Sequence, residues 1–282
     1  MVKMGSVWDR TVEFLGDNLA RIVPIALLTI LVPTSISGSL SPLWSNASPS
    51  VQAGLALLSL GFAVIGVWGQ LAISALAIDP AIGRDAGRVA TARLLPAIGV
   101  YVLLFVVLGL LMVPTGVILL AGGVDLARLG AAGTMPADLP AGAMAAAALY
   151  VLLLVIALLF VGARLAPLTP VIVAERRGVG AIARALSLSR GLTWALFGVI
   201  LLYGVVANVA ALAARTVFGS ILGLLSHGEG PVTVATVITA IAASAVQTGF
   251  MVLATAFVAR LYVAILRAQG AAAATPLGAD PA

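Results

Sequence analysis

Apolar residues run through this chain in long stretches that charged residues interrupt only at intervals. The uncharged stretches are Ile22–Ile78, Leu94–Val124, Leu139–Ala163, Gly191–Ala214 and Gly230–Ala259. A helix needs about 20 apolar residues to cross the hydrocarbon core of a bilayer, and the first stretch is long enough for two crossings. Its centre, residues 35–50, is rich in Ser, Pro and Asn and is predicted to be a turn.

This pattern predicts an all-α integral membrane protein with six transmembrane helices. The expected spans lie near residues 22–40, 51–78, 95–120, 143–163, 192–214 and 232–259. Residues 1–267 are expected to form one membrane domain. Residues 268–282 are small and weakly polar, which is typical of a disordered tail.

Amphipathic or basic segments precede the first, third and fifth spans. In residues 6–21 the charged positions lie opposite one apolar helical face. That face contains Trp8, Val12, Leu15, Leu19 and Ile22. The pattern predicts a helix that lies in the membrane plane, either among the lipid headgroups or packed on the protein's own surface. Residues 79–93 repeat it weakly, and the loop after the fourth span predicts a second short helix of this kind.

Because each such segment precedes a pair of spans, the chain is expected to contain three copies of one unit, at 5–78, 83–174 and 178–267. Near the end of the second span of each copy, Gln70, Arg164 and Arg260 would then be equivalent. The alternative is that any protein with six spans contains hairpins of about this length.

Composition and charge agree with a membrane protein and orient it. The 282 residues are 62% hydrophobic and 9% charged, whereas about a quarter of the residues of a soluble domain are charged. With the N-terminus inside, Arg128 and Arg215 are the two basic residues on the outer side, and the other thirteen are inside. By the positive-inside rule both termini are cytosolic. A background of Arg, Ala, Gly and Val indicates a bacterium with a GC-rich genome, and hence a bacterial inner membrane.

The loop after the fourth span carries a family resemblance. Its residues are Arg164-Leu165, Pro170, Glu175, Gly178, Ala181, Arg184, Ser189-Arg190-Gly191 and Trp194. They resemble the signature of the glycerophosphoryl diester phosphodiesterase membrane-domain family, whose members are multi-pass bacterial proteins. The end of the chain, from Ala259-Arg260-Leu261-Tyr262 to Arg267, is similar to that family's ending. Ala185 stands where such proteins often have Ser. No segment is long enough for the soluble phosphodiesterase domain after which the family is named.

Groups for catalysis or metal binding are sparse in the sequence. Cysteine is absent, and His227 with Glu229 nearby falls short of a metal site. The carboxylates of the outer loops are scattered, and Glu175 is flanked by two arginines. We therefore expect neither an enzyme nor a cofactor.

Two functional classes remain. In the first, a non-catalytic protein contacts anionic lipid headgroups, a protein partner or a second copy of itself through a basic cytosolic face, and no nucleic acid partner is expected. The candidate residues are Arg164, Glu175, Arg177, Arg184, Arg190 and Arg260. Glu175 would pair with a nearby arginine, leaving Arg184 and Arg190 for phosphates. In the second, a transporter or channel would use polar residues at mid-depth, for which Gln70, Asn208 and Gln247 are the candidates.

Overall fold

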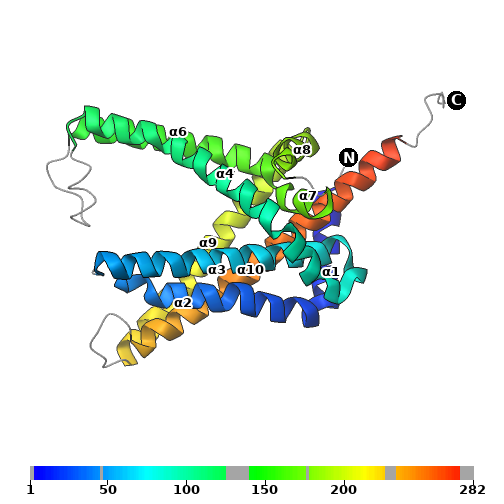
Figure 1. Ribbon diagram of the computed structural model, residues 1–282, viewed down its shortest axis with the longest axis horizontal. Coiled ribbons are helices and arrows are strands. Elements are labelled where there is room, and N and C mark those ends of the chain that lie inside the picture. The colour runs from blue at the N-terminus through cyan, green and yellow to red at the C-terminus, as the bar shows by residue number, and fades with distance from the viewer. Residues whose placement is uncertain (1–2, 45–46, 125–139, 176–177, 226–232, 274–282) are drawn as a thin grey trace.

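The computed structural model describes residues 3–44, 47–124, 140–175, 178–225 and 233–273, which fold into helices without a strand among them (Figure 1). The α-helices are α1 (Met4–Ala26), α2 (Val32–Leu40), α3 (Pro49–Ile78), α4 (Ala86–Ala121), α6 (Ala141–Leu165), α7 (Leu168–Glu175), α8 (Gly180–Leu188), α9 (Thr193–Leu225) and α10 (Val234–Ala273). A π-helix, η1 (Leu27–Leu31), joins α1 to α2, and the 3-10 helices η2 (Ser41–Leu43) and η3 (Pro80–Asp85) follow α2 and α3. In the described part of the chain, six helical stretches are long and apolar enough to cross a membrane, which confirms the predicted fold class.

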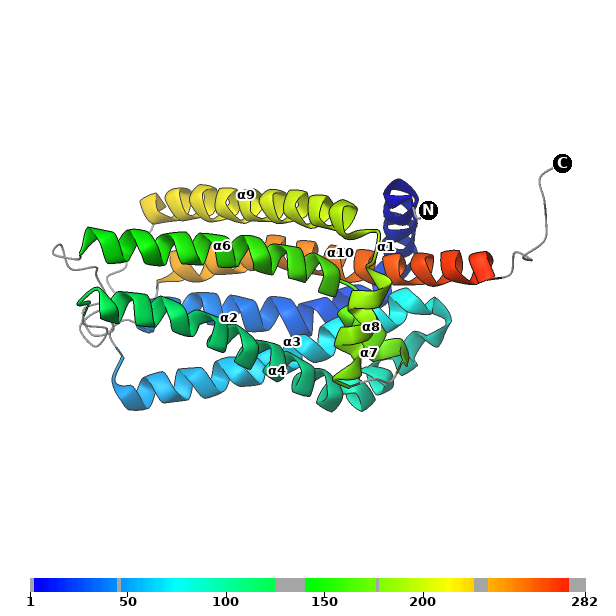
Figure 2. The ribbon, with the colours of Figure 1, turned by 90° about the horizontal axis from the view of Figure 1, so that it is seen from above.

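The long helices converge at one end of the molecule and fan out towards the other (Figure 1). We call the converging end the vertex, where α7, α8, the start of α1 and the C-terminal half of α10 meet. The other end, where α4 finishes and α10 begins, is the open end. The first part of α1 lies across the long direction of the bundle, and so do α7 and α8 (Figure 2). The start of α1 and the end of α10 both lie on the vertex side.

Burial follows the same division. In α3 the buried residues lie in the C-terminal third, from Gly69 to Ala77. In α4 they lie in the first half, the last of them being Val100. Both ranges face the vertex. Towards the open end the helices instead expose large apolar side chains, for example Leu57 at 71% and Phe105 at 76%. Water would solvate such a surface poorly, whereas lipid chains solvate it well. The exposed apolar residues therefore agree with a multi-pass membrane protein.

The predicted turn at residues 35–50 is too long. Helix α2 continues to Leu40, and α3 begins at Pro49. Serine is tolerated in this helix because its hydroxyl bonds the carbonyl one turn back, as Ser39 does to Ser35 at 2.8 Å. The fifth span is also longer than predicted, since α9 continues to Leu225.

The prolines that end the fourth span do not end helical structure. Helix α6 stops at Leu165, and a new short helix, α7, begins at Leu168 with Pro170 in its first turn. Proline is well placed there because the first amides of a helix have no partner within it. The sequence therefore predicted the break and missed the helix that follows it.

The passage from α1 to α2 is continuous but irregular, and proline explains why. Pro33 has no N–H to donate to the carbonyl of Thr29, so the hydrogen-bond ladder widens into the π-helix. The side chain of Thr29 then meets α3 at Gly69, where a Cβ would lie 1.9 Å from Thr29 Oγ1. Only glycine fits this helix crossing.

Helix α1 uses two different faces. Val7, Phe14 and Ile22 are buried, whereas Trp8 is 46% exposed and Val12 is 51% exposed. The predicted apolar face is thus largely the exposed one, available to lipid, while a neighbouring face packs on the protein. The alternative of packing on the protein's own surface therefore applies to one face, and a position among the lipid headgroups stays a prediction for the other.

The segments predicted to lie in the membrane plane make a recurring set of contacts. The second span of the first copy contacts the in-plane segment of the second copy. The second copy contacts the third in the same way, and the third contacts the first. The contacts are Trp68 with Thr91, Arg164 with Leu186, and Arg260 with Phe14. They support threefold repetition, which stays a prediction.

Candidate functional site at the vertex

Helices α7 and α8 form the centre of the vertex. Helix α8 buries Ala181, Ala185 and Leu188, which lie on one face at helical spacing. It ends where Ser189 bonds back to the carbonyl of Ala185. Gly191 then takes a left-handed conformation with φ 82°, which turns the chain into α9.

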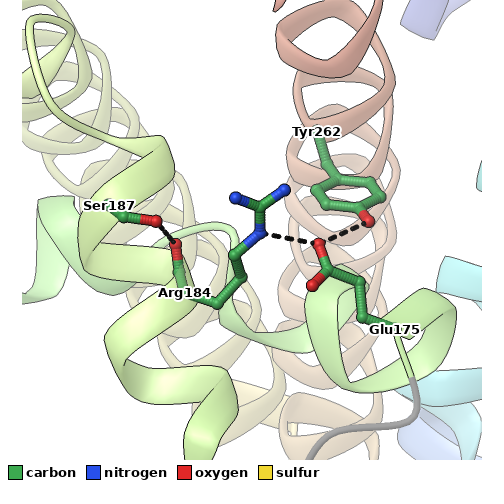
Figure 3. Close-up of polar contacts among 4 residues, drawn as sticks. All are labelled: Glu175, Arg184, Ser187 and Tyr262. Atoms are coloured by element: carbon green, nitrogen blue, oxygen red, sulfur yellow. Dashed lines mark hydrogen bonds and ion pairs between the residues drawn. The ribbon is translucent and has the colours of Figure 1, made fainter.

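Glu175 is the polar centre of this arrangement (Figure 3). Its Oε1 accepts a hydrogen bond from Arg184 Nε at 3.0 Å and another from the Tyr262 hydroxyl at 3.2 Å. A carboxylate at the C-terminus of a helix is unfavourable with respect to the helix dipole, so the two donors compensate for its position. Since Tyr262 is buried on α10, Glu175 fastens α7 and α8 to the last span.

Two more predicted arginines join helices in the same region. Arg164, at the end of α6, donates from Nη2 to the carbonyl of Leu186 in α8 at 3.3 Å. Arg260 on α10 lies over the ring of Phe14 in α1, 4.6 Å from its centre. Both side chains are half-buried, and each contacts a specific group of a neighbouring helix.

Part of the predicted basic face therefore consists of arginines that connect helices within the protein. Glu175 pairs with a nearby arginine as expected, but that arginine is Arg184, so the prediction that Arg184 is left for phosphates is wrong for its Nε. That pairing occupies Nε, while the two terminal nitrogens of Arg184 point away from Glu175 (Figure 3). Arg190 is exposed and available to a ligand. Arg177 lies outside the described residues.

The three polar residues predicted at mid-depth do not converge. Gln70 on α3 contacts Met251 Sδ on α10 at 3.7 Å. Asn208 is exposed on α9 and donates to the carbonyl of Gly204 in its own helix at 2.8 Å. Gln247 on α10 lines a cavity that the other two do not reach. They do not share one pathway.

Two cavities adjoin α10. The first, of about 450 Å³, is almost wholly apolar and lies between α9, α10 and the start of α1, with Trp8 and Phe257 in its wall. The second, of about 570 Å³, lies towards the open end between α2, α9 and α10, and its wall includes several hydroxyls, Gln247 and Arg215. We call them the apolar cavity and the polar cavity.

Sequence reasoning missed several of these features for identifiable reasons. Tyr262 was noted only as part of the chain's ending, because an aromatic residue in a span carries no signal of its partner. The cavities depend on which faces of distant helices meet. The charge count assigns Arg215 to the outer side but gives no sign that it lines a cavity.

Within the described residues, no group of three His, Asp or Glu side chains is placed to hold a metal ion. Comparison with family models, with curated proteins and with solved structures gives no match to this chain.

Proposed function

We propose that this chain is a non-catalytic protein of a bacterial inner membrane that binds an anionic lipid, with the vertex on the cytosolic side. The observation that carries the proposal is the position of the apolar cavity. Ala166, Leu196 and Leu261 belong to its wall. Each follows an arginine closely along the chain: Arg164, Arg190 and Arg260. A lipid chain in the cavity would have its headgroup near these cations.

Charge distribution supports the orientation. Among the described residues, the basic side chains apart from Arg215 belong to segments at the vertex. Arginine and lysine concentrate on the cytosolic side of inner-membrane proteins. This distribution supports the proposal that both termini and the lipid headgroup lie on the cytosolic side.

The acyl chain and the headgroup of the lipid contribute differently to the binding free energy. An acyl chain that leaves the bilayer for an apolar cavity gains little, because lipid tails are as apolar as the cavity wall. The cavity therefore gives position and shape selection. Each nearby arginine adds about 1 kcal/mol for an anionic headgroup, roughly a fivefold preference. Arg190 is the best candidate for this role because it is exposed and is not part of the Glu175 cluster.

The test is native mass spectrometry of protein released from bilayers that mix phosphatidylglycerol with phosphatidylcholine. Wild-type protein should retain phosphatidylglycerol, and Val206→Trp, which fills the apolar cavity, should lose it. Val209→Trp, one turn further along α9 and outside the cavity, is the matched control and should retain lipid.

A second pair of variants tests the headgroup. Arg190→Gln should reduce the preference for phosphatidylglycerol about fivefold, while Arg88→Gln, an exposed arginine elsewhere at the vertex, should change it little. If both variants lose the same amount, the basic residues act as a diffuse field and set orientation only. If Val206→Trp retains the lipid, the proposal is wrong.

A transporter is the second candidate, favoured by one observation: a polar cavity includes Gln247, near the middle of the last span. A transporter must expose such a cavity to both sides in turn, whereas a static binding protein exposes it to one. Since the chain has no native cysteine, Ser244→Cys can be labelled with an impermeant maleimide in vesicles of each orientation. Labelling from both sides would favour transport.

A further inference from the structure

The polar cavity is open because its walls are built from small residues. Gly38 of α2 faces Ala240 of α10 so closely that an added Cβ would lie 3.4 Å from the Ala240 Cβ. Gly219 of α9 faces Thr239, whose Cγ2 would lie in ordinary contact, 3.8 Å from an added Cβ. Larger side chains at these positions would close the space between the three helices.

Helix α10 directs its polar groups into this space. Thr236, Ser244 and Gln247 lie at the spacing of one helical face and line the cavity. Ser244 is buried, at 5% exposure, and its hydroxyl has no hydrogen-bond partner among the described residues. Hydrocarbon around such groups would leave their hydrogen bonds unmade, which is unfavourable. The cavity therefore suits water or a polar ligand better than a lipid chain.

Arg215 supplies the charge. It is the one charged side chain on the described helices outside the vertex segments, and no described carboxylate pairs with it. It lies ten residues before the end of α9 at Leu225, about 15 Å along a helix. An arginine inside a span normally faces water or a partner of opposite charge. The wall of the polar cavity provides that setting.

From these observations we infer that the polar cavity is a water-filled binding site for a small solute or headgroup that carries one anionic oxygen group, a carboxylate or a phosphate. Arg215 pairs with the anion, because its planar fork matches two oxygens of either group. The hydroxyls and the amide of Gln247 bond the neutral polar part. Arg215 is the single cation among the described wall residues, which fits one anionic group rather than a polyanion. This site is separate from the apolar cavity and does not depend on the proposed lipid function.

Single cysteines test both the water and the anion. Thr239→Cys and Ser244→Cys replace hydroxyls in the cavity with thiols of similar size. In phosphatidylcholine nanodiscs both should react with a charged, impermeant maleimide. Val209→Cys, which is 62% exposed on α9 but lies in neither cavity, should not react.

The anion is then added in two arms. Inorganic phosphate at millimolar concentration should slow labelling of Ser244→Cys severalfold if the ligand is a soluble solute. Phosphatidylglycerol in the nanodisc should slow it if the ligand is a lipid headgroup. Either effect should disappear with Arg215→Gln and persist with Arg215→Lys at reduced strength.

Two results would overturn the inference. If neither cysteine reacts, the cavity is dry. If both react but neither phosphate nor phosphatidylglycerol slows the reaction, the cavity is an aqueous recess without an anion site. Neither result bears on lipid binding in the apolar cavity, which the tryptophan variants test separately.

Discussion

The vertex and the open end share the long helices but follow different rules of packing. At the vertex, short helices lie across long ones, side chains interlock and arginines join neighbouring helices. At the open end, the helices separate and turn Leu, Val and Phe outward. Water would favour packing of both ends. In lipid, apolar surface gains little by leaving the bilayer, so helices associate where close fit or polar contacts favour it. The difference indicates that shape and hydrogen bonding determine this fold.

The largest expected effect comes from emptying the vertex core. Leu76 is 1% exposed, and Leu76→Ala should destabilise the protein by about 2–4 kcal/mol because the cavity left behind loses its packing contacts. The measurement is the unfolding equilibrium in mixed micelles titrated with SDS. Leu57→Ala, on the same helix but 71% exposed, should change stability by less than about 0.5 kcal/mol. If the two variants lost the same stability, the vertex would not be packed more tightly than the open end.

The next effect tests shape alone. Gly69→Ala should destabilise by about 1–3 kcal/mol, because the new Cβ would overlap Thr29. Gly61→Ala on the same helix has open space around it and should be neutral or slightly stabilising, by about 0.5–1 kcal/mol. Thermal unfolding in detergent measures both variants. Thr29→Ala should recover part of the loss at Gly69, since it removes the nearest atom.

These residues also indicate how far the sequence could predict the structure. Six spans and the position of α8 follow from hydrophobic stretches and periodicity, which depend on local sequence. Pro33 signals an irregular helix, but nothing in the sequence says that the irregular turn meets Gly69. That contact depends on how two helices cross. The pairing of Glu175 with an arginine was predicted from charge, whereas the second donor, Tyr262, lies 87 residues away.

The Glu175 cluster gives the third expected effect. Tyr262→Phe removes a hydrogen bond to a charged acceptor and should destabilise by about 1–2 kcal/mol. Glu175→Gln should cost about as much, because it weakens the bond from Arg184 as well. A double variant should cost less than the sum if the two residues act through the same bond. Unfolding in SDS titrations gives the coupling, and strictly additive losses would show that the two side chains act independently.

The smallest expected effect comes from a tyrosine towards the open end. It tests whether polar contacts also hold helices together there. Tyr150 on α6 donates to the carbonyl of Leu111 in α4 at 2.7 Å. Pro114 lies three residues further along α4. It has no N–H for the carbonyl of Leu110, and its ring is expected to weaken the neighbouring helical bond to the carbonyl of Leu111 as well. Membrane helices tolerate proline where a neighbouring helix satisfies the freed backbone groups.

Tyr150→Phe should therefore destabilise by about 0.6–1 kcal/mol, the range of hydrogen bonds between helices in membranes. If proline creates the need for the bond, the cost should shrink in a Pro114→Ala background, where the helix supplies its own donors. A cost that is the same in both backgrounds would mean that Tyr150 holds α4 and α6 together without regard to the kink. A shrinking cost would mean that the two residues form one unit. In that case packing at the open end also depends on a polar contact, because the Tyr150 hydroxyl bonds a carbonyl whose helical donor the proline has weakened.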